Sequence, residues 1–115
     1  FDLKNYWNND LFHAYFIKVE NELIGFALVE TGINGLPHSI NEFFVMKKFS
    51  GKGYGAIAAT ILFDRFRGNW KITQIANNYP AQAFWRKVIH EYTNGNYKEY
   101  YDEHHRSIQE FISHN

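Results

Sequence analysis

A glycine-rich segment in the middle of the chain is the part of the sequence best suited to hold a ligand. It spans residues 47–55 and reads Lys-Lys-Phe-Ser-Gly-Lys-Gly-Tyr-Gly. Glycines let a backbone approach a ligand closely and point successive N–H groups toward it. A predicted helix at 56–67 adds unpaired N–H groups and a partial positive charge. With Lys47, Lys48 and Lys52, this predicts a phosphate-binding loop, although a tight strand-to-helix turn with solvated lysines gives the same pattern.

Three phosphate-binding motifs compete for this loop. The Walker A motif requires Gly-Lys-Ser/Thr after four intervening residues, and the loop lacks it. The dinucleotide motif G-x-G-x-x-G/A is met by Gly51, Gly53 and Ala56, but that fold places an acidic residue at the end of the next strand. Here that strand ends at 75–77 in Ile-Ala-Asn, and three predicted strands precede the loop instead of one. The third candidate is the loop that binds the pyrophosphate of acetyl-CoA.

The elements that must position this loop follow from the spacing of apolar residues. Residues 81–92 carry apolar side chains at helical spacing; Pro80 suits the first turn of that helix and Asn94-Gly95 its end. Residues 40–46 are nearly all apolar, which favours a strand covered on both faces. The expected order is β-β-β-α-β-α-β-β: after a loop or helix end at 6–11 come strands 13–20, 23–30 and 40–46, a helix 56–67, a strand 70–76, a helix opening at 77–80, and strands 97–103 and 108–113. This order predicts a mixed α/β domain.

Composition limits the classes of protein and partner. With 115 residues, 45% of them hydrophobic, the chain is expected to form a single domain, 1–115. Twelve basic and twelve acidic side chains cancel, which argues against nucleic acid or an anionic membrane as the main partner. No apolar run approaches the roughly 20 residues of a membrane helix, so we expect a cytoplasmic protein. The absence of cysteine excludes thiolate metal sites and a cysteine acyl-enzyme.

Two blocks of the sequence together resemble the GNAT superfamily of N-acetyltransferases. The family's loop motif, R/Q-x-x-G-x-G/A, is filled by residues 50–55, and residues 41–46 resemble the strand that precedes it. Farther on, residues 78–85 read Asn-Tyr-Pro-Ala-Gln-Ala-Phe-Trp and resemble the family's N-x-x-A-x-x-F-Y segment. The resemblance covers about residues 23–101, and the order and separation of the two blocks also match the family.

The resemblance implies a fold, a reaction and a binding site. The fold is a GNAT-like α/β arrangement, a mixed and mostly antiparallel twisted sheet flanked by helices. The reaction is the direct attack of a primary amine on the thioester of acetyl-CoA, a cosubstrate, with no metal. The implied cofactor-binding residues are Phe44, Val45, Ser50, Gly51, Lys52, Gly53, Tyr54, Gly55, Ala56, Asn78, Phe84 and Trp85.

Glu42 is the candidate catalytic residue. An amine must be neutral to attack, and a lysine-type amine has an ordinary pKa of about 10.4, so a base must help. A carboxylate in an apolar strand is costly unless it has a task or a partner, although a solvated or lysine-paired Glu42 explains the sequence equally well. Backbone N–H groups around Phe44 and Val45 resemble the family's polariser of the thioester carbonyl.

The sequence departs from the family at three places. Ser50 replaces the loop's Arg or Gln, which removes a side-chain contact and leaves the backbone cradle. Trp85 stands where the family has a Tyr that often protonates the leaving thiolate, and an indole N–H does not act as an acid. The resemblance also implies that the family's first strand and much of its first helical region would lie before Phe1, where a longer natural chain would supply them. A noncatalytic acyl-CoA-binding or regulatory domain is therefore the alternative function, and a homodimer and the identity of the amine acceptor are left open.

Several other side chains have both a structural and a functional interpretation. Asn78 can contact the pantetheine arm, cap the following helix, or do both. Residues 104–105 are two histidines, but without further ligands at suitable spacing a solvated turn is the better interpretation. Tyr97, Tyr100 and Tyr101 can line an acceptor pocket or supply an acid, although such residues more often pack on a sheet face. Phe84 and Trp85 have helical spacing that favours core packing.

Overall fold

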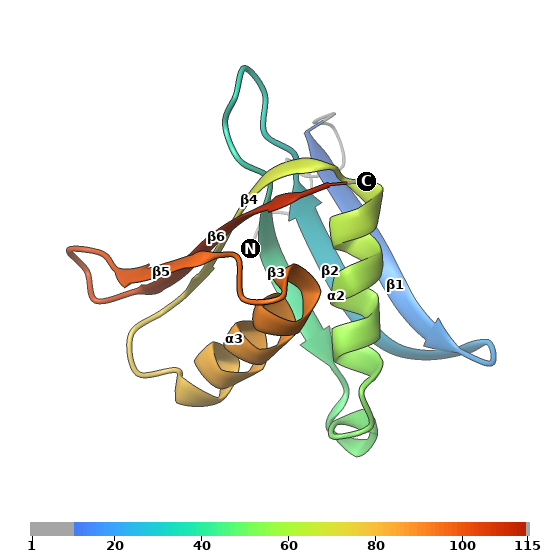
Figure 1. The fold of residues 1–115 in the computed structure, drawn as a ribbon. Helices are drawn as coiled ribbons and strands as arrows, with labels where there is room; N and C mark the ends of the chain where they lie inside the picture. Colours follow the sequence, from blue (N-terminus) through green and yellow to red (C-terminus); the bar gives the residue numbers. More distant parts are fainter. Residues whose placement is uncertain (1–10, 115) are drawn as a thin grey trace.

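The computed structural model describes residues 11–114, so most of the segment 6–11 lies outside the described residues. Within that range the order of strands and helices is the one expected from the sequence, and most ends differ from the expected ones by one to three residues (Figure 1). The elements are β1 (Phe12–Val19), β2 (Glu22–Glu30), β3 (Ser39–Val45), the short 3-10 helix η1 (Lys47–Phe49), α2 (Tyr54–Arg65), β4 (Gly68–Gln74), α3 (Tyr79–Thr93), β5 (Lys98–Tyr101) and β6 (Ser107–Ser113).

The first sheet has the antiparallel order β1-β2-β3. Glu20 and Asn21 link β1 to β2 with φ values of 51° and 70°, and two positive φ angles in succession suit the right-handed twist of a two-residue hairpin. A register shift leaves Asn41 of β3 without a partner residue on β2. Its side-chain amide donates a hydrogen bond to Glu30 at 3.0 Å instead. This bulge lies in the first half of β3, and the strand continues from there to the glycine loop.

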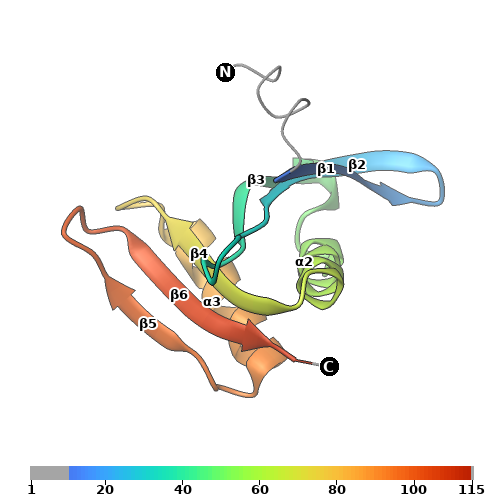
Figure 2. The same cartoon turned by 90° about the horizontal axis from the view of Figure 1, so that it is seen from above.

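The second sheet has the antiparallel order β4-β6-β5 and runs at an angle to the first (Figure 2). A parallel bridge joins the two sheets where β3 and β4 begin: the His38 N–H donates to the Asn69 carbonyl at 2.8 Å, and the Lys71 N–H donates to the His38 carbonyl at 2.9 Å. Beyond this bridge β3 is an edge strand of its own sheet. The edge of β3 that faces β4 therefore keeps backbone groups that no strand pairing satisfies among residues 11–114.

The core joins both sheets and both helices around Phe63 of α2. Its ring lies 5.1 Å from Trp70 of β4, 4.8 Å from Phe111 of β6 and 5.2 Å from Tyr92 of α3, centroid to centroid. Aromatic pairs at such distances stabilise by about 0.5–1.5 kcal/mol beyond the burial of their surface. This cluster fixes α2 and α3 against the second sheet and so sets the position of the glycine loop that precedes α2.

The expectation that strand 40–46 is covered on both faces is wrong for the described residues. Phe43 packs against the core, but Phe44 is 55% exposed and Met46 is 43% exposed. The physical reason is alternation: successive side chains of a strand point to opposite faces, and both helices lie on the face that Phe43 shares. Phe44 instead lies in register with Phe26 and Phe16 on the opposite face.

His38 also fixes the junction of the sheets with its side chain. A backbone N–H can only donate, so the Gly32 N–H donates to Nδ1 at 3.0 Å, and the proton is on Nε2, which donates to the Arg67 carbonyl at 2.7 Å. Gly32 must be glycine here, since an added Cβ would lie 1.9 Å from the Leu36 carbonyl oxygen. The imidazole thus ties the loop before β3 to the chain just before β4.

We expect His38→Phe to lower the free energy of unfolding by about 1–3 kcal/mol, because it keeps an aromatic ring and removes both side-chain hydrogen bonds. Urea unfolding followed by tryptophan fluorescence measures the change. His104→Phe is the control at an exposed position and should change stability by less than about 0.5 kcal/mol. Equal stability of the two variants would show that the imidazole does not hold the sheets together.

Asp102 organises the turn between β5 and β6. Its carboxylate accepts hydrogen bonds from the backbone N–H groups of His104 and Arg106, each at 2.9 Å, and pairs with the Arg106 guanidinium at 2.7 Å. Desolvation raises the pKa of Asp102, but the hydrogen bonds and the charge of Arg106 lower it by more, so that the pKa is about 2. The ionised carboxylate is therefore the form that the folded turn prefers.

Because the pKa of Asp102 is lower in the folded than in the unfolded chain, its stabilisation is present above about pH 4 and is lost as the pH falls toward about 2. Asp102→Asn should therefore lower the melting temperature at pH 7, and the difference from the parent should shrink between pH 4 and pH 2. Glu103→Gln changes an almost fully exposed neighbour and should give little difference at either pH. A difference for Asp102→Asn that is independent of pH would contradict this account.

Candidate functional site

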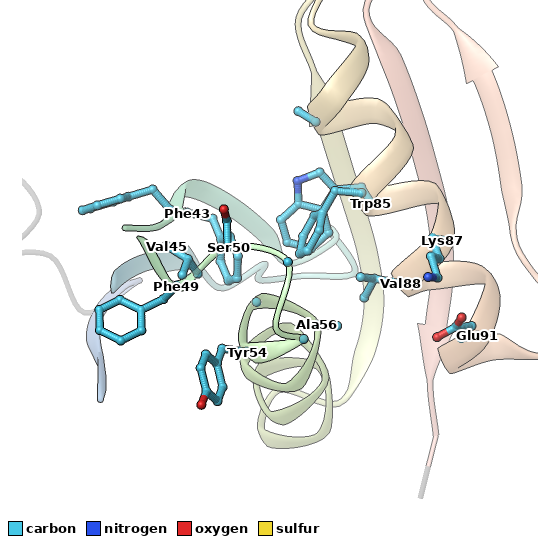
Figure 3. Close-up of a pocket in the computed structure, with 16 residues that line it drawn as sticks. Phe43, Val45, Phe49, Ser50, Tyr54, Ala56, Trp85, Lys87, Val88 and Glu91 are labelled. Atoms are coloured by element: carbon cyan, nitrogen blue, oxygen red, sulfur yellow. The ribbon is translucent and has the colours of Figure 1, made fainter. Parts of the chain in front are cut away.

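A cavity of about 610 Å³ lies where the end of β3, the glycine loop, the start of α2 and α3 meet (Figure 3). Ten of the twelve cofactor-binding residues expected from the sequence line it, although the sequence separates them by up to 41 positions. They are Phe44, Val45, Ser50, Gly51, Gly53, Tyr54, Gly55, Ala56, Phe84 and Trp85. The two others, Lys52 and Asn78, are exposed and lie outside the lining.

The glycine loop owes its shape to two left-handed residues. Gly51 has φ 77° and Gly53 has φ 84°, a backbone conformation that costs other residues about 1–2 kcal/mol. Gly53 caps α2, so the N–H groups of the first helical turn have no partner within the helix. Ser50 closes the loop by donating its hydroxyl to the Lys47 carbonyl at 2.7 Å. The loop thus presents backbone donors and a helix N-terminus to the cavity.

Another wall of the cavity includes the unpaired edge of β3, next to the loop. The Met46 N–H donates to the Ile24 carbonyl of β2 at 2.7 Å. Since N–H groups alternate between the two edges of a strand, the Phe44 N–H also faces β2, and the Val45 N–H points from the free edge. Of the two backbone donors considered from the sequence, Val45 is therefore the one directed toward the space between β3 and β4.

Aromatic side chains form the inner end of the cavity. The Trp85 ring lies 5.0 Å from Phe43 and 5.0 Å from Phe84, and only 7% of Trp85 is exposed. Its indole N–H has no hydrogen-bond partner among residues 11–114, so this donor is available to a molecule in the cavity. Asn78 lies outside the cavity and caps α3, where its side chain accepts from the Ala81 N–H at 3.3 Å. Capping is the role that the structure gives Asn78.

Glu42 does not line the cavity. It is exposed and pairs in register with Leu28, and alternation directs its side chain to the face that Phe44 occupies, opposite Phe43 and Val45. Within residues 11–114 its carboxylate has no hydrogen bond and no ion pair. Phe43, Phe44 and Val45 of β3 all contribute to the lining, whereas Glu42, earlier in the same strand, does not.

Sequence reasoning missed two charged residues of the site, Lys87 and Glu91 of α3. They continue the helical stripe that begins at Phe84, and this spacing was the signal that could have revealed them. The loop lysines, in contrast, lie outside the lining. Lys48 instead pairs with Glu22 at 3.5 Å.

The remaining candidates lie away from the cavity. Tyr97 packs beside His90, the Tyr100 hydroxyl donates to Glu110, and Tyr101 is exposed on β5. In the described part of the chain, no three or more His, Asp or Glu side chains gather in a group able to hold a metal ion. Nor is any helix within residues 11–114 long and apolar enough to cross a membrane.

Solved structures of acetyltransferases share this fold. An acetyltransferase of Thermus thermophilus matches 96% of this chain and 70% of its own, with a TM-score of 0.74 and 14% identity. The ribosomal-protein-S18-alanine N-acetyltransferase of Escherichia coli matches 100% and 79%, with a TM-score of 0.70 and 12% identity. A Bacillus anthracis protein described as a streptothricin acetyltransferase, in complex with acetyl coenzyme A, matches 100% and 69%, with a TM-score of 0.63 and 20% identity.

The sequence itself gives the family. The model of the acetyltransferase (GNAT) family matches residues 1–90, and the chain belongs to that family. A search of curated proteins finds no match. The arrangement of sheets and helices and the likeness to these acetyltransferase structures confirm the GNAT-like fold expected from the sequence.

Proposed function

We propose that this chain binds acetyl-CoA in the cavity and transfers its acetyl group to a primary amine. The observation that carries the proposal is the meeting of two kinds of backbone donor at one apolar cavity. The glycine loop and the start of α2 offer N–H groups suited to a pyrophosphate, and the free edge of β3 offers an N–H suited to a carbonyl. One of the solved structures similar to this chain is a complex with acetyl coenzyme A, which supports the same ligand.

In this proposal each wall of the cavity has its own task. The loop holds the pyrophosphate, and the aromatic end formed by Phe43, Phe84 and Trp85 receives the apolar part of the pantetheine arm. The Val45 N–H donates to the thioester oxygen and stabilises the negative charge that develops there. The amine nitrogen attacks the carbonyl carbon, the carbon–sulfur bond breaks, and the amine loses a proton.

Two groups of this chain are assigned to the proton and to the leaving sulfur. Glu42 takes the amine proton through a water molecule, because its carboxylate does not line the cavity. The Trp85 N–H, which has no partner among residues 11–114, donates a hydrogen bond to the sulfur but transfers no proton. The thiolate then takes its proton from solvent.

A binding module without catalysis is the second candidate function. Two observations favour it: Glu42 lies outside the cavity, and the residue at the position of the family's tyrosine is Trp85. For either function we propose that the partners do not include nucleic acid, because basic and acidic side chains cancel. We also propose a cytoplasmic protein, as expected from the lengths of the apolar runs.

Gly53→Ala should weaken CoA binding by at least about tenfold, because the added Cβ enters the space that a phosphate needs. Gly35→Ala is a matched control, since Gly35 has the same φ of 84° with nothing within 4 Å and does not line the cavity. Both substitutions place a Cβ on a residue with a φ of 84°, so a difference in isothermal titration reports on the site. If the parent chain bound CoA no more tightly than it binds NAD or ATP, the proposed ligand would be refuted.

Glu42→Gln should keep the affinity for CoA and lower kcat by roughly 10²–10⁴ at pH 7 with an amine acceptor. The loss should be smaller at high pH, where free amine is abundant. Glu20→Gln, in the exposed β1–β2 turn, is the control and should leave kcat unchanged. Turnover that survives the loss of Glu42 would assign the base elsewhere, and CoA binding without turnover for any amine would favour the binding module.

A further inference from the structure

Lys87 is the lysine that lines the cavity, although the sequence suggested a different set of cations. The same lining includes the glycine loop and two further residues of α3, Val88 and Glu91. Figure 3 shows Lys87 and Glu91 on α3, across the cavity from the loop. A ligand held by the loop is therefore exposed to one positive and one negative side chain from the opposite wall.

Arg86 and its neighbour Lys87 differ in whether their charge is paired with a carboxylate. The Arg86 guanidinium donates to both oxygens of Glu99, at 2.9 and 3.0 Å, and these hydrogen bonds raise the pKa of Arg86 above its usual value. Lys87 makes no ion pair within residues 11–114. Glu91 lies one turn farther on, but a lysine that precedes a glutamate by four residues is the less favourable order for pairing on a helix. The ammonium of Lys87 is thus available to an external anion.

We propose that Lys87 binds a phosphate group of coenzyme A that the glycine loop does not hold. This inference rests on the proposed function. The loop offers N–H donors to one part of the ligand, whereas coenzyme A carries its pyrophosphate and a separate 3′-phosphate. A lysine acts on phosphate as a flexible point charge and does not need the fixed geometry of an arginine.

Glu91 has the opposite effect in the same proposal. Its carboxylate lines the cavity one helical turn from Lys87 and repels the bound phosphate. The two side chains also line a second hollow that includes His90, so they belong to both hollows of α3. Affinity for the coenzyme is then set by the balance of Lys87 and Glu91, and the carboxylate favours release.

The test compares CoA with dephospho-CoA, which lacks the 3′-phosphate, by isothermal titration at low and high salt. Lys87→Met should weaken CoA binding about tenfold at low salt, and less at high salt, where exposed charges are screened. Glu91→Gln should strengthen it about two- to threefold. Lys18→Met, which removes an exposed lysine of β1 outside the cavity, is the matched control and should change neither affinity.

The outcomes separate this inference from the proposed function. A loss for Lys87→Met with CoA but not with dephospho-CoA assigns Lys87 to the 3′-phosphate, and an equal loss with both assigns it to the pyrophosphate and overturns the inference. CoA that binds the parent chain and Lys87→Met equally also overturns the inference and leaves the proposed function intact. CoA that does not bind the parent chain refutes the proposed function itself.

Discussion

The site depends on the separation of β3 from β4 beyond the bridge at His38. Each backbone group of a strand needs a hydrogen-bond partner, and two strands that diverge leave one row of donors and acceptors without a neighbour. Here the His38 backbone pairs with both Asn69 and Lys71, so the strands are held together at one end only. The donor at Val45 is exposed to a ligand because the sheet is interrupted at this place.

An open edge of this kind is stable only if the surroundings hold it open. The packing of Phe63 against Trp70, Phe111 and Tyr92 fixes both helices to the second sheet, and the cluster of Phe43, Phe84 and Trp85 fills the inner end of the gap. Phe43 of β3 thus packs against two rings of α3 on a strand that is the edge of its own sheet. The cavity is thus a product of the core packing, and the glycine loop is only one of its walls.

Helix α3 divides its polar residues between structure and ligand. Arg86 and Gln82 face away from the cavity, where Arg86 pairs with Glu99 and the Gln82 amide donates to the Ile75 carbonyl at 3.3 Å. Glu99 in turn accepts from the buried Gln109 at 2.8 Å. Lys87 and Glu91 lie on the cavity side without such partners among residues 11–114. A side chain that is already bonded contributes to the fold, and one that is not can contribute to binding.

The sequence by itself determined the order of the elements, the loop and most of the cavity lining. Helical spacing along α3, the cap at Asn78 and glycines at positions where φ is positive are local signals for the elements and the loop. The lining residues followed from the resemblance of two sequence blocks to the GNAT family. Only the tertiary structure decided which face each side chain occupies. Both helices pack on the face of β3 that carries Phe43, which leaves the Glu42 and Phe44 side chains on the other face. The packing of α3 places Lys87 in the same cavity lining as the loop. These outcomes follow from contacts between distant segments, which no local pattern records.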